Sequence, residues 1–244
     1  MIVCEFDGNK QNDVNFGNTA SIVEARTNNR VKPIHFGVNY HEKPLEFKLV
    51  FGSERVLDRY ELENISMWLT GHQNYQWLTI DQPDMERVMF RCLITELKPI
   101  SHGWLPVAFE AKVRCDCPYA YGYPFSTTYE ISGTTTILFR NESSVHEYIK
   151  PILKIVPNYG VSEIRIKNKS DGNREFILAG IPSSNISIIV DNERGIIQEN
   201  THNYNLYPHF NLNFFRLVHG DNNIEIIGDC SFTIEGRFLY NVAG

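Results

Sequence analysis

Hydrophobic and polar residues alternate over short stretches along most of the chain, which is the pattern of half-buried β-strands. In Leu45–Phe51 every odd-numbered residue is leucine or phenylalanine, so one face of this strand is apolar. A polar turn at 81–84 joins two further runs as a hairpin, and a loop is expected at Pro99–Pro106. The strands predicted in this half are Ser21–Arg26, Leu45–Phe51, Tyr75–Ile80, Val88–Leu97 and Val107–Cys117.

One segment, at about residues 58–70, has the period of a helix instead. Asp58 and Glu61 have the spacing of a capping box, in which each side chain accepts a hydrogen bond from the other residue's backbone. Four apolar residues then recur at steps of three and four, and Gly71 is placed to end the helix. These residues are Leu62, Ile65, Trp68 and Leu69.

The second half consists of short alternating runs separated by Gly, Asn and Asp turns at regular spacing, which is typical of a β-sandwich or jelly roll. The predicted strands are Thr134–Arg140, Ile152–Pro157, Ser162–Lys167, Glu175–Ala179, Ile186–Asp191, Gly195–Glu199, Phe214–Leu217, Ile224–Ile227 and Ser231–Tyr240.

A change of character at Pro118–Pro124 suggests a domain boundary. This segment is rich in proline, glycine and tyrosine and has neither a helical nor a strand period. We expect a mostly β protein with one helix in its N-terminal half and two β-sandwich domains, 1–122 and 123–244, the second jelly-roll or galectin-like.

The composition excludes several classes of protein. The chain has 244 residues, 42% hydrophobic and 21% charged, which is typical of a folded domain rather than a disordered chain. Its net charge of −6 argues against a nucleic-acid binder, because such proteins usually carry a basic surface. No apolar run is long enough for a membrane helix. The first ten residues lack the apolar core of a signal peptide, so we expect synthesis in the cytoplasm.

No catalytic or metal-binding motif is present in the sequence. Asp81, Asp84 and Glu86 cluster in one predicted turn, which favours a solvated loop tip over a catalytic carboxylate pair. His202 and His209 share an Asn- and Tyr-rich loop without other metal ligands nearby, which favours a surface loop. We therefore expect no enzyme activity, no cofactor and no metal.

The five cysteines form no metal-binding spacing. Cys115 and Cys117 lie two residues apart on a predicted strand, where their Cα atoms are about 6.6 Å apart, the outer limit for a disulfide. We interpret them as reduced thiols in the core.

Saccharide binding is an alternative for the second domain. The stretch from His209 to Asn213, which contains Asn211, is similar to a histidine- and asparagine-containing segment of galectins, although Leu212 and Asn213 replace its proline and arginine. The second half has no tryptophan to stack on a sugar, and Tyr207 is the candidate substitute. His209, Asn211 and Tyr207 are therefore the candidate saccharide contacts, and the alternative function is receptor binding to host cell-wall saccharide.

The order of these features resembles the distal tail proteins of phages with long, non-contractile tails. The resemblance comprises the helix ending at Trp68–Gly71, the acidic hairpin turn, the strand ending at Cys117–Tyr119, and the closing stretch Phe215–Ile224 followed by Ser231–Phe238. His219 stands where proline is common in that family.

The resemblance implies a structural protein of the virion tail tip. In that family the N-terminal domain forms a ring of six copies stacked on the tail tube protein, and fibre, lysin or baseplate proteins dock below it. The C-terminal domain is galectin-like or carbohydrate-module-like and mostly docks proteins. Partners would therefore be further copies of the chain and other tail proteins, with no specific nucleic acid and no membrane insertion.

The three tryptophans are assigned different roles from their contexts. Trp68 and Trp77 lie on an apolar helix face and an apolar strand, so we expect both in the core. Trp104 lies in a Gly- and Pro-containing segment and is the candidate protein-interface residue.

Overall fold

The computed structural model describes residues 2–6, 18–26, 31–53, 55–83, 85–182, 186–200 and 204–242. The fold class is confirmed: the chain is mostly β, its sheets are antiparallel and form β-sandwich-like domains, and its single described α-helix lies in the N-terminal half. The chain divides into two compact units, Met1–Tyr121 with Asn241–Gly244, and Gly122–Tyr240. The predicted domain limits, 1–122 and 123–244, stay a prediction.

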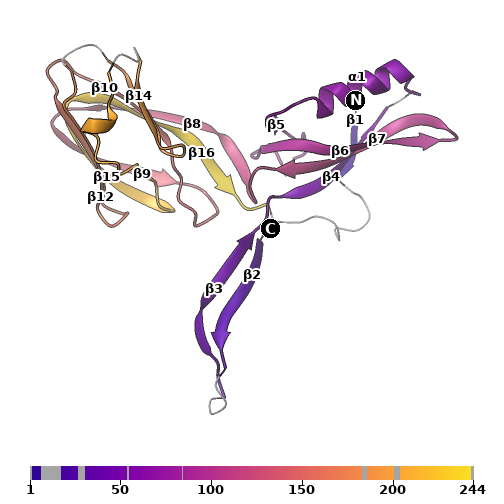
Figure 1. Ribbon diagram of the computed structural model, residues 1–244, viewed down its shortest axis with the longest axis horizontal. Helices are drawn as coiled ribbons and strands as arrows, with labels where there is room; N and C mark the ends of the chain where they lie inside the picture. The colour runs from indigo at the N-terminus through magenta and orange to yellow at the C-terminus, as the bar shows by residue number, and fades with distance from the viewer. Residues whose placement is uncertain are drawn as a thin grey trace. The chain divides into compact units, whose positions relative to one another are not determined.

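The first unit is built on a five-stranded antiparallel sheet (Figure 1). Its strands, in spatial order, are β1 (Ile2–Phe6), β4 (Glu46–Gly52), β7 (Leu105–Cys115), β6 (Phe90–His102) and β5 (Gln76–Leu78).

One face of this sheet is apolar and the other carries paired charges. Phe47 and Leu49 of β4 are buried and pack with Phe109 and Val113 of β7 in one core. The intervening residues face the opposite way, where ion pairs join neighbouring strands, as between Lys48 and Glu110 (3.5 Å). Because strand side chains alternate between faces, the period-two pattern of β4 and β7 places their apolar residues on one face, where they form the core.

Helix α1 (Arg59–Thr70) lies along the sheet (Figure 1). The predicted capping box is confirmed: Asp58 Oδ1 accepts a hydrogen bond from the Glu61 N–H (2.9 Å), and Glu61 Oε2 accepts one from the Asp58 N–H (3.0 Å). The Gly71 N–H donates to the Met67 carbonyl at the C-terminal end. The residues that pack against the core are Leu62, Ile65 and Leu69.

Two of the tryptophan predictions are wrong. Trp68 is 59% exposed and Trp77 is 44% exposed, so neither is a core residue. Trp68 lies at the edge of the apolar helix face, where successive residues are about 100° apart, so spacing alone did not distinguish the edge of the stripe from its centre. Trp77 lies on a three-residue edge strand and makes an edge-to-face contact with Tyr121.

The loop predicted at Pro99–Pro106 is instead the end of a long hairpin. β6 continues to His102 and β7 begins at Leu105, and these two residues pair directly across the turn. Pro99 and Pro106 belong to the strands, where the register is irregular between Ile100 and Ser101. The prediction failed because prolines are tolerated beside such irregularities.

A separate two-stranded ribbon also belongs to the first unit. β2 (Asn18–Ala25) pairs with β3 (Ile34–Glu42), and among the described strands neither pairs with any other (Figure 1). The prediction of a strand near Ser21–Arg26 is confirmed, whereas β3 was not predicted.

The second unit is a sandwich of two antiparallel sheets. One sheet has the order β14-β13-β10-β16-β8 and the other the order β12-β11-β15-β9. Both contribute to a single apolar core, with Leu153 and Phe232 from the first sheet and Ile166 and Ile226 from the second. The strands are β8 (Ala120–Ile131), β9 (Thr134–Asn141), β10 (Ile152–Pro157), β11 (Glu163–Asn168), β12 (Arg174–Ala179), β13 (Ile188–Asp191), β14 (Ile196–Glu199), β15 (Gly220–Ile227) and β16 (Cys230–Tyr240).

Two sequence predictions in this region are wrong. β8 runs through the aromatic segment that we expected to lack a strand period. It forms because it pairs with β16, a tertiary contact that local pattern does not reveal. The predicted strand Phe214–Leu217 contains only an isolated bridge between Leu217 and Ile149.

The described cysteines are free thiols. Cys92, Cys115 and Cys230 are buried and Cys117 is half-buried, which agrees with reduced core thiols. Burial raises the pKa of Cys92 to about 11 and that of Cys230 to about 12. The side chain of Cys4 lies outside the described residues.

Candidate functional site

The turn between β6 and β7 places the predicted interface residue at the tip of a hairpin. Gly103 (φ 57°) and Trp104 (φ 72°) are both in the left-handed region, as in the two-residue turns that suit the twist of paired strands. Glycine and asparagine normally occupy such positions, whereas a bulky side chain there is an outlier. Trp104 thus adopts a backbone conformation that its side chain disfavours.

The Trp104 side chain is 98% exposed, so it packs against nothing in its own copy. Its neighbours Ile100 and Leu105 are also exposed, which makes the end of the hairpin apolar. A left-handed conformation costs a non-glycine residue about 1–2 kcal/mol. Residues with a strained backbone cluster at functional sites. Trp104 combines such strain with an exposed aromatic ring that does not stabilise the fold of its own copy.

Helix α1 also has exposed apolar side chains on the side away from the sheet, next to the exposed polar residues Glu63 and Asn64. Tyr60 and Met67 lie two turns apart on its outer face and are exposed, and Trp68 lies beside them. Sequence reasoning missed Tyr60 and Met67 because it followed only the stripe that faces the core. A second pair of apolar residues at a spacing of seven was the available signal.

The β2–β3 ribbon has exposed apolar side chains as well. Ile22 lies on β2, and Phe36 lies on β3. A two-stranded ribbon alone is at best marginally stable in water, because it buries little apolar surface. A ribbon of this kind gains stability when it pairs with or packs on another chain.

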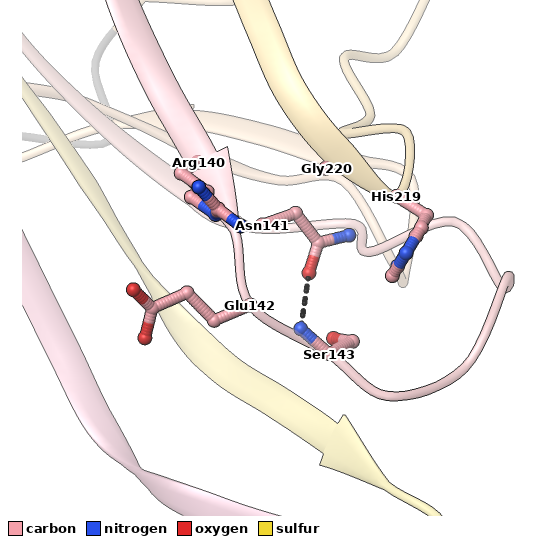
Figure 2. Close-up of a pocket in the computed structure, with 6 residues that line it drawn as sticks. All are labelled: Arg140, Asn141, Glu142, Ser143, His219 and Gly220. Atoms are coloured by element: carbon pink, nitrogen blue, oxygen red, sulfur yellow. Dashed lines mark hydrogen bonds between the residues drawn. The ribbon is translucent and has the colours of Figure 1, made fainter.

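A shallow polar pocket of about 350 Å³ lies at the end of β9 in the second unit (Figure 2). Asn141 and Ser143 are buried, and their polar groups are used within the fold: the Ser143 N–H donates to Asn141 Oδ1 (3.1 Å), and Ser143 Oγ accepts from the Leu239 N–H (3.0 Å). The lining residues are Arg140, Asn141, Glu142, Ser143, His219 and Gly220.

The chemistry of this pocket is that of a polar surface hollow. The His219 ring is in edge contact with the His146 ring, with centroids 4.6 Å apart. Arg140 has no ion-pair partner among the described residues, and no group of three His, Cys, Asp or Glu side chains in the described part of the chain is arranged to hold a metal. The pocket residues come from two paired strands that are about eighty positions apart in sequence. The sequence therefore gave no indication that these residues lie together.

The three candidate saccharide contacts do not line this pocket, and their polar atoms bind groups of their own chain. His209 Nε2 is 2.9 Å from the Tyr204 hydroxyl. Asn211 donates to the Glu175 carbonyl (2.9 Å) and accepts from the Ile177 N–H (3.1 Å). Its amide thus extends the hydrogen bonding of β12.

Tyr207 has a similar internal role. It begins a short 3-10 helix, Tyr207–His209, and its hydroxyl donates to the Gly195 carbonyl (3.2 Å) and accepts from the Ile197 N–H (3.3 Å). These bonds hold the loop against β14. The saccharide role of these residues stays a prediction, and the geometry gives each a structural role.

The remaining predicted polar clusters are surface features in the described part of the chain. Asp81 and Glu86 are exposed in the turn between β5 and β6, whereas Asp84 and His202 lie outside the described residues. Among the described helices, α1 included, none has the length and hydrophobicity that crossing a membrane requires.

Comparison with known proteins identifies relatives of both halves. Residues 1–117 match the family model described as a phage tail protein N-terminal domain, and residues 119–235 match the one described as a phage tail C-terminal domain. A search of curated proteins found no match.

Solved structures share the fold over most of the chain. The Dit (gp 19.1) protein of phage SPP1, described as a paradigm of the hub adsorption apparatus in phages that infect Gram-positive bacteria, superimposes with a TM-score of 0.67 at 12% identity, covering 98% of this chain and 93% of that one.

A chain of the phage P2 baseplate, in its activated conformation with Ca, matches with a TM-score of 0.53 at 13% identity, covering 91% of this chain and 87% of that one. The resemblance to distal tail proteins is therefore confirmed. Because the two family models together span nearly the whole sequence, this chain belongs to the phage tail proteins, with the fold of a tail hub.

Proposed function

We propose that this protein is a structural hub of the phage tail tip, forming a ring of six copies that joins the tail tube to baseplate or fibre proteins. The observation that carries the proposal is the match of both halves to phage tail domains, together with the fold of a hub protein over 98% of the chain. Its role is to organise other proteins, without catalysis or a cofactor.

The exposed surfaces of the first unit support assembly. The hairpin tip, the outer face of α1 and the β2–β3 ribbon each carry exposed apolar side chains in one copy. Subunit interfaces are enriched in Trp, Tyr and Met relative to the rest of a protein surface. Trp, Tyr and Met are exposed on the hairpin tip and on the outer face of α1, which are two of these three surfaces. We therefore assign ring formation to the first unit. We assign peripheral docking to the second unit.

Mass and shape in solution test the proposal. One copy has a mass of 28.2 kDa. Light scattering on a sizing column, with negative-stain images of the main peak, is expected to show a closed ring of six copies, about 169 kDa. In purified phage particles, gold-labelled antibody against the chain is expected at the distal end of the tail. A chain that is monomeric in solution and absent from the tail tip would contradict the proposal.

Direct contact with cell-wall saccharide is the alternative, and it concerns the second unit. The hydrogen bonds that engage His209, Asn211 and Tyr207 weaken it. A glycan array probed with the full chain separates the two functions, since a hub without receptor activity leaves the array unbound.

A further inference from the structure

We propose that Cys92 and Cys115 are a redox-sensitive pair that a peroxide oxidises to a disulfide between β6 and β7. The inference concerns a single copy of the chain, so it does not depend on the proposed ring. It differs from the pair that sequence spacing brings close, Cys115 and Cys117, because strand pairing places another thiol directly opposite Cys115.

The register of β6 and β7 sets Cys92 opposite Cys115. The Asp116 N–H donates to the Arg91 carbonyl (2.9 Å), so the neighbouring pair is the hydrogen-bonded one. The Cys115 N–H points away from β6 and donates to the Leu45 carbonyl (2.8 Å). Cys92 and Cys115 are therefore a non-hydrogen-bonded pair, in which the Cα atoms are about 4.5 Å apart and the side chains approach most closely.

This spacing lies within the range of a disulfide, whose Cα atoms are about 4.4–6.8 Å apart. Because opposite residues of an antiparallel pair share one face, both thiols lie in the same apolar core. An ion pair between Arg91 and Asp116 (3.6 Å) joins the two strands beside the cysteines and helps to hold the register. The fold thus keeps the two thiols facing each other.

Cys117 is the competing partner for Cys115, and its position is less favourable. It follows the end of β7, and two residues along an extended chain the Cα separation of about 6.6 Å is close to the outer limit for a disulfide. Its Sγ is also engaged with the Tyr119 carbonyl (3.1 Å). Cys230 belongs to the second unit. Among the described cysteines, Cys92 is therefore the partner that the geometry favours.

The reaction consumes one hydrogen peroxide and releases two waters. The Cys92 thiolate attacks one peroxide oxygen, the O–O bond breaks, and a sulfenic acid and a hydroxide form. The Cys115 thiolate then attacks the Cys92 sulfur and displaces a second hydroxide as the S–S bond closes. The two hydroxides take up the two thiol protons. The two sulfurs are oxidised and the peroxide oxygens are reduced.

Burial explains why the pair persists as thiols until it meets an oxidant. Cys92 is 6% exposed and Cys115 is 1% exposed. Burial raises the pKa of both thiols, that of Cys92 to about 11. Because the thiolate is the reactive form and is scarce at neutral pH, oxidation is slow and becomes faster as pH rises. Cys92 has the lower pKa and the greater exposure, so it is the thiol that reacts first.

The bond would fasten β6 to β7 at the base of the hairpin whose tip carries Trp104 (Figure 1). A disulfide stabilises a fold mainly by restricting the unfolded chain, and it does so more for longer loops. Disulfides persist in oxidising surroundings and are lost in reducing ones. The stability of this hairpin would therefore depend on the redox environment of the protein.

Peptide mapping after oxidation tests the pair in the full chain. The protein is purified with a reductant, freed of it, treated with hydrogen peroxide without denaturant, alkylated in denaturant and digested without reduction. Mass spectrometry is expected to show one pair of peptides joined through Cys92 and Cys115. Thiol titration in denaturant is expected to fall by two from the five cysteines of the sequence.

Matched variants and melting curves provide the second measurement. Cys92→Ser is expected to abolish the link and the loss of two thiols, whereas Cys117→Ser is expected to keep both. Oxidation of the parent protein is expected to raise its melting temperature by about 5–10 °C, and a reductant is expected to reverse the shift. An oxidised parent with a lower melting temperature would show that the bond distorts the hairpin, and the proposal would fail.

The peptide map of the parent protein decides the outcome even if a variant does not fold. A link from Cys115 to Cys117 or to Cys4 overturns the proposed pair. So does a parent protein in which Cys92 and Cys115 stay thiols, or in which each is oxidised to a sulfinic or sulfonic acid without a link. A chain that is monomeric by light scattering overturns the proposed ring and leaves this pair unaffected.

Discussion

At the residue scale, buried asparagine side chains in the second unit form hydrogen bonds with backbone groups of the loops. Asn222 is fully buried: its Nδ2 donates to the Val218 (2.9 Å) and Gly220 (2.9 Å) carbonyls, and its Oδ1 accepts from the Val218 N–H (2.8 Å) and Asn168 Nδ2 (2.8 Å). A buried polar group left without a partner costs free energy, so this network determines the loop conformation.

Removing this amide should therefore destabilise the second unit. Asn222→Ala leaves several buried groups unpaired and is expected to lower the free energy of unfolding by about 2–4 kcal/mol. Urea denaturation followed by tyrosine fluorescence measures the change. Asn158→Ala, at an exposed position, is the control and is expected to change stability by less than about 0.5 kcal/mol. Equal effects of the two substitutions would show that the amide network contributes little.

Trp104 provides a test in which folding and assembly change in opposite directions. Trp104→Gly relieves the left-handed conformation, so a monomeric sample is expected to gain roughly 0.5–1 kcal/mol after the added flexibility of the unfolded chain is counted. The proposed ring is expected to weaken because the predicted interface residue is lost. Thermal unfolding and light scattering on the same sample measure both. A destabilised monomer would mean that the indole supports its own fold.

At the element scale, the capping box fixes the start of α1 and thus the orientation of its outer face. Glu61 accepts hydrogen bonds from Asp58 N–H and from the Arg55 guanidinium. The Arg55 contact, followed by the Asp58 backbone bond, lowers the pKa of Glu61. A depressed carboxyl pKa stabilises the fold above the unfolded-state value, and this stabilisation is lost as pH falls through the folded-state value.

Removal of the cap should weaken the helix and the assembly together. Asp58→Ala is expected to lower the free energy of unfolding by about 1 kcal/mol. Glu61→Gln removes the carboxylate whose titration is linked to folding. As pH drops below about 4.5, the free energy of unfolding of this variant is therefore expected to fall less than that of the parent protein. Circular dichroism melts from pH 3 to pH 7 compare the two. A parent protein whose stability is flat over this range would contradict the assigned role of Glu61.

At the scale of the whole molecule, net charge acts against assembly. Each copy carries −6, so the proposed ring of six would carry about −36, and attractive contacts would have to offset its self-repulsion. We propose that the same charge keeps DNA from adhering to the lumen of the ring. A basic lumen surface in a solved ring would contradict this role.

The salt dependence of assembly distinguishes apolar anchoring from anchoring by ion pairs. Salt screens repulsion between copies and strengthens apolar burial. We therefore expect the ring fraction to rise as ionic strength increases from about 0.02 M to 0.3 M. Sedimentation velocity at fixed protein concentration measures this fraction. Dissociation of the ring at high salt would indicate that ion pairs hold it.

The sequence by itself determined the elements that depend on local pattern. Strands such as Leu45–Phe51 and Ile152–Pro157, the capping box at Asp58 and the sandwich class of the second half follow from alternation and turn residues, because these signals act within a few positions. The order of the elements also sufficed for the resemblance to distal tail proteins, which the comparisons confirmed.

Tertiary structure decided what depends on distant partners. β8 forms across Ala120–Ile131 because β16 pairs with it, and Trp68 is exposed because the core ends at the neighbouring Leu62–Leu69 stripe. The polar pocket joins the end of β9 to the start of β15, and hydrogen bonds to distant backbone engage Asn211. Local pattern contains no information about which strands meet, so exposure, pockets and the left-handed turn that presents Trp104 emerge only once the chain is folded.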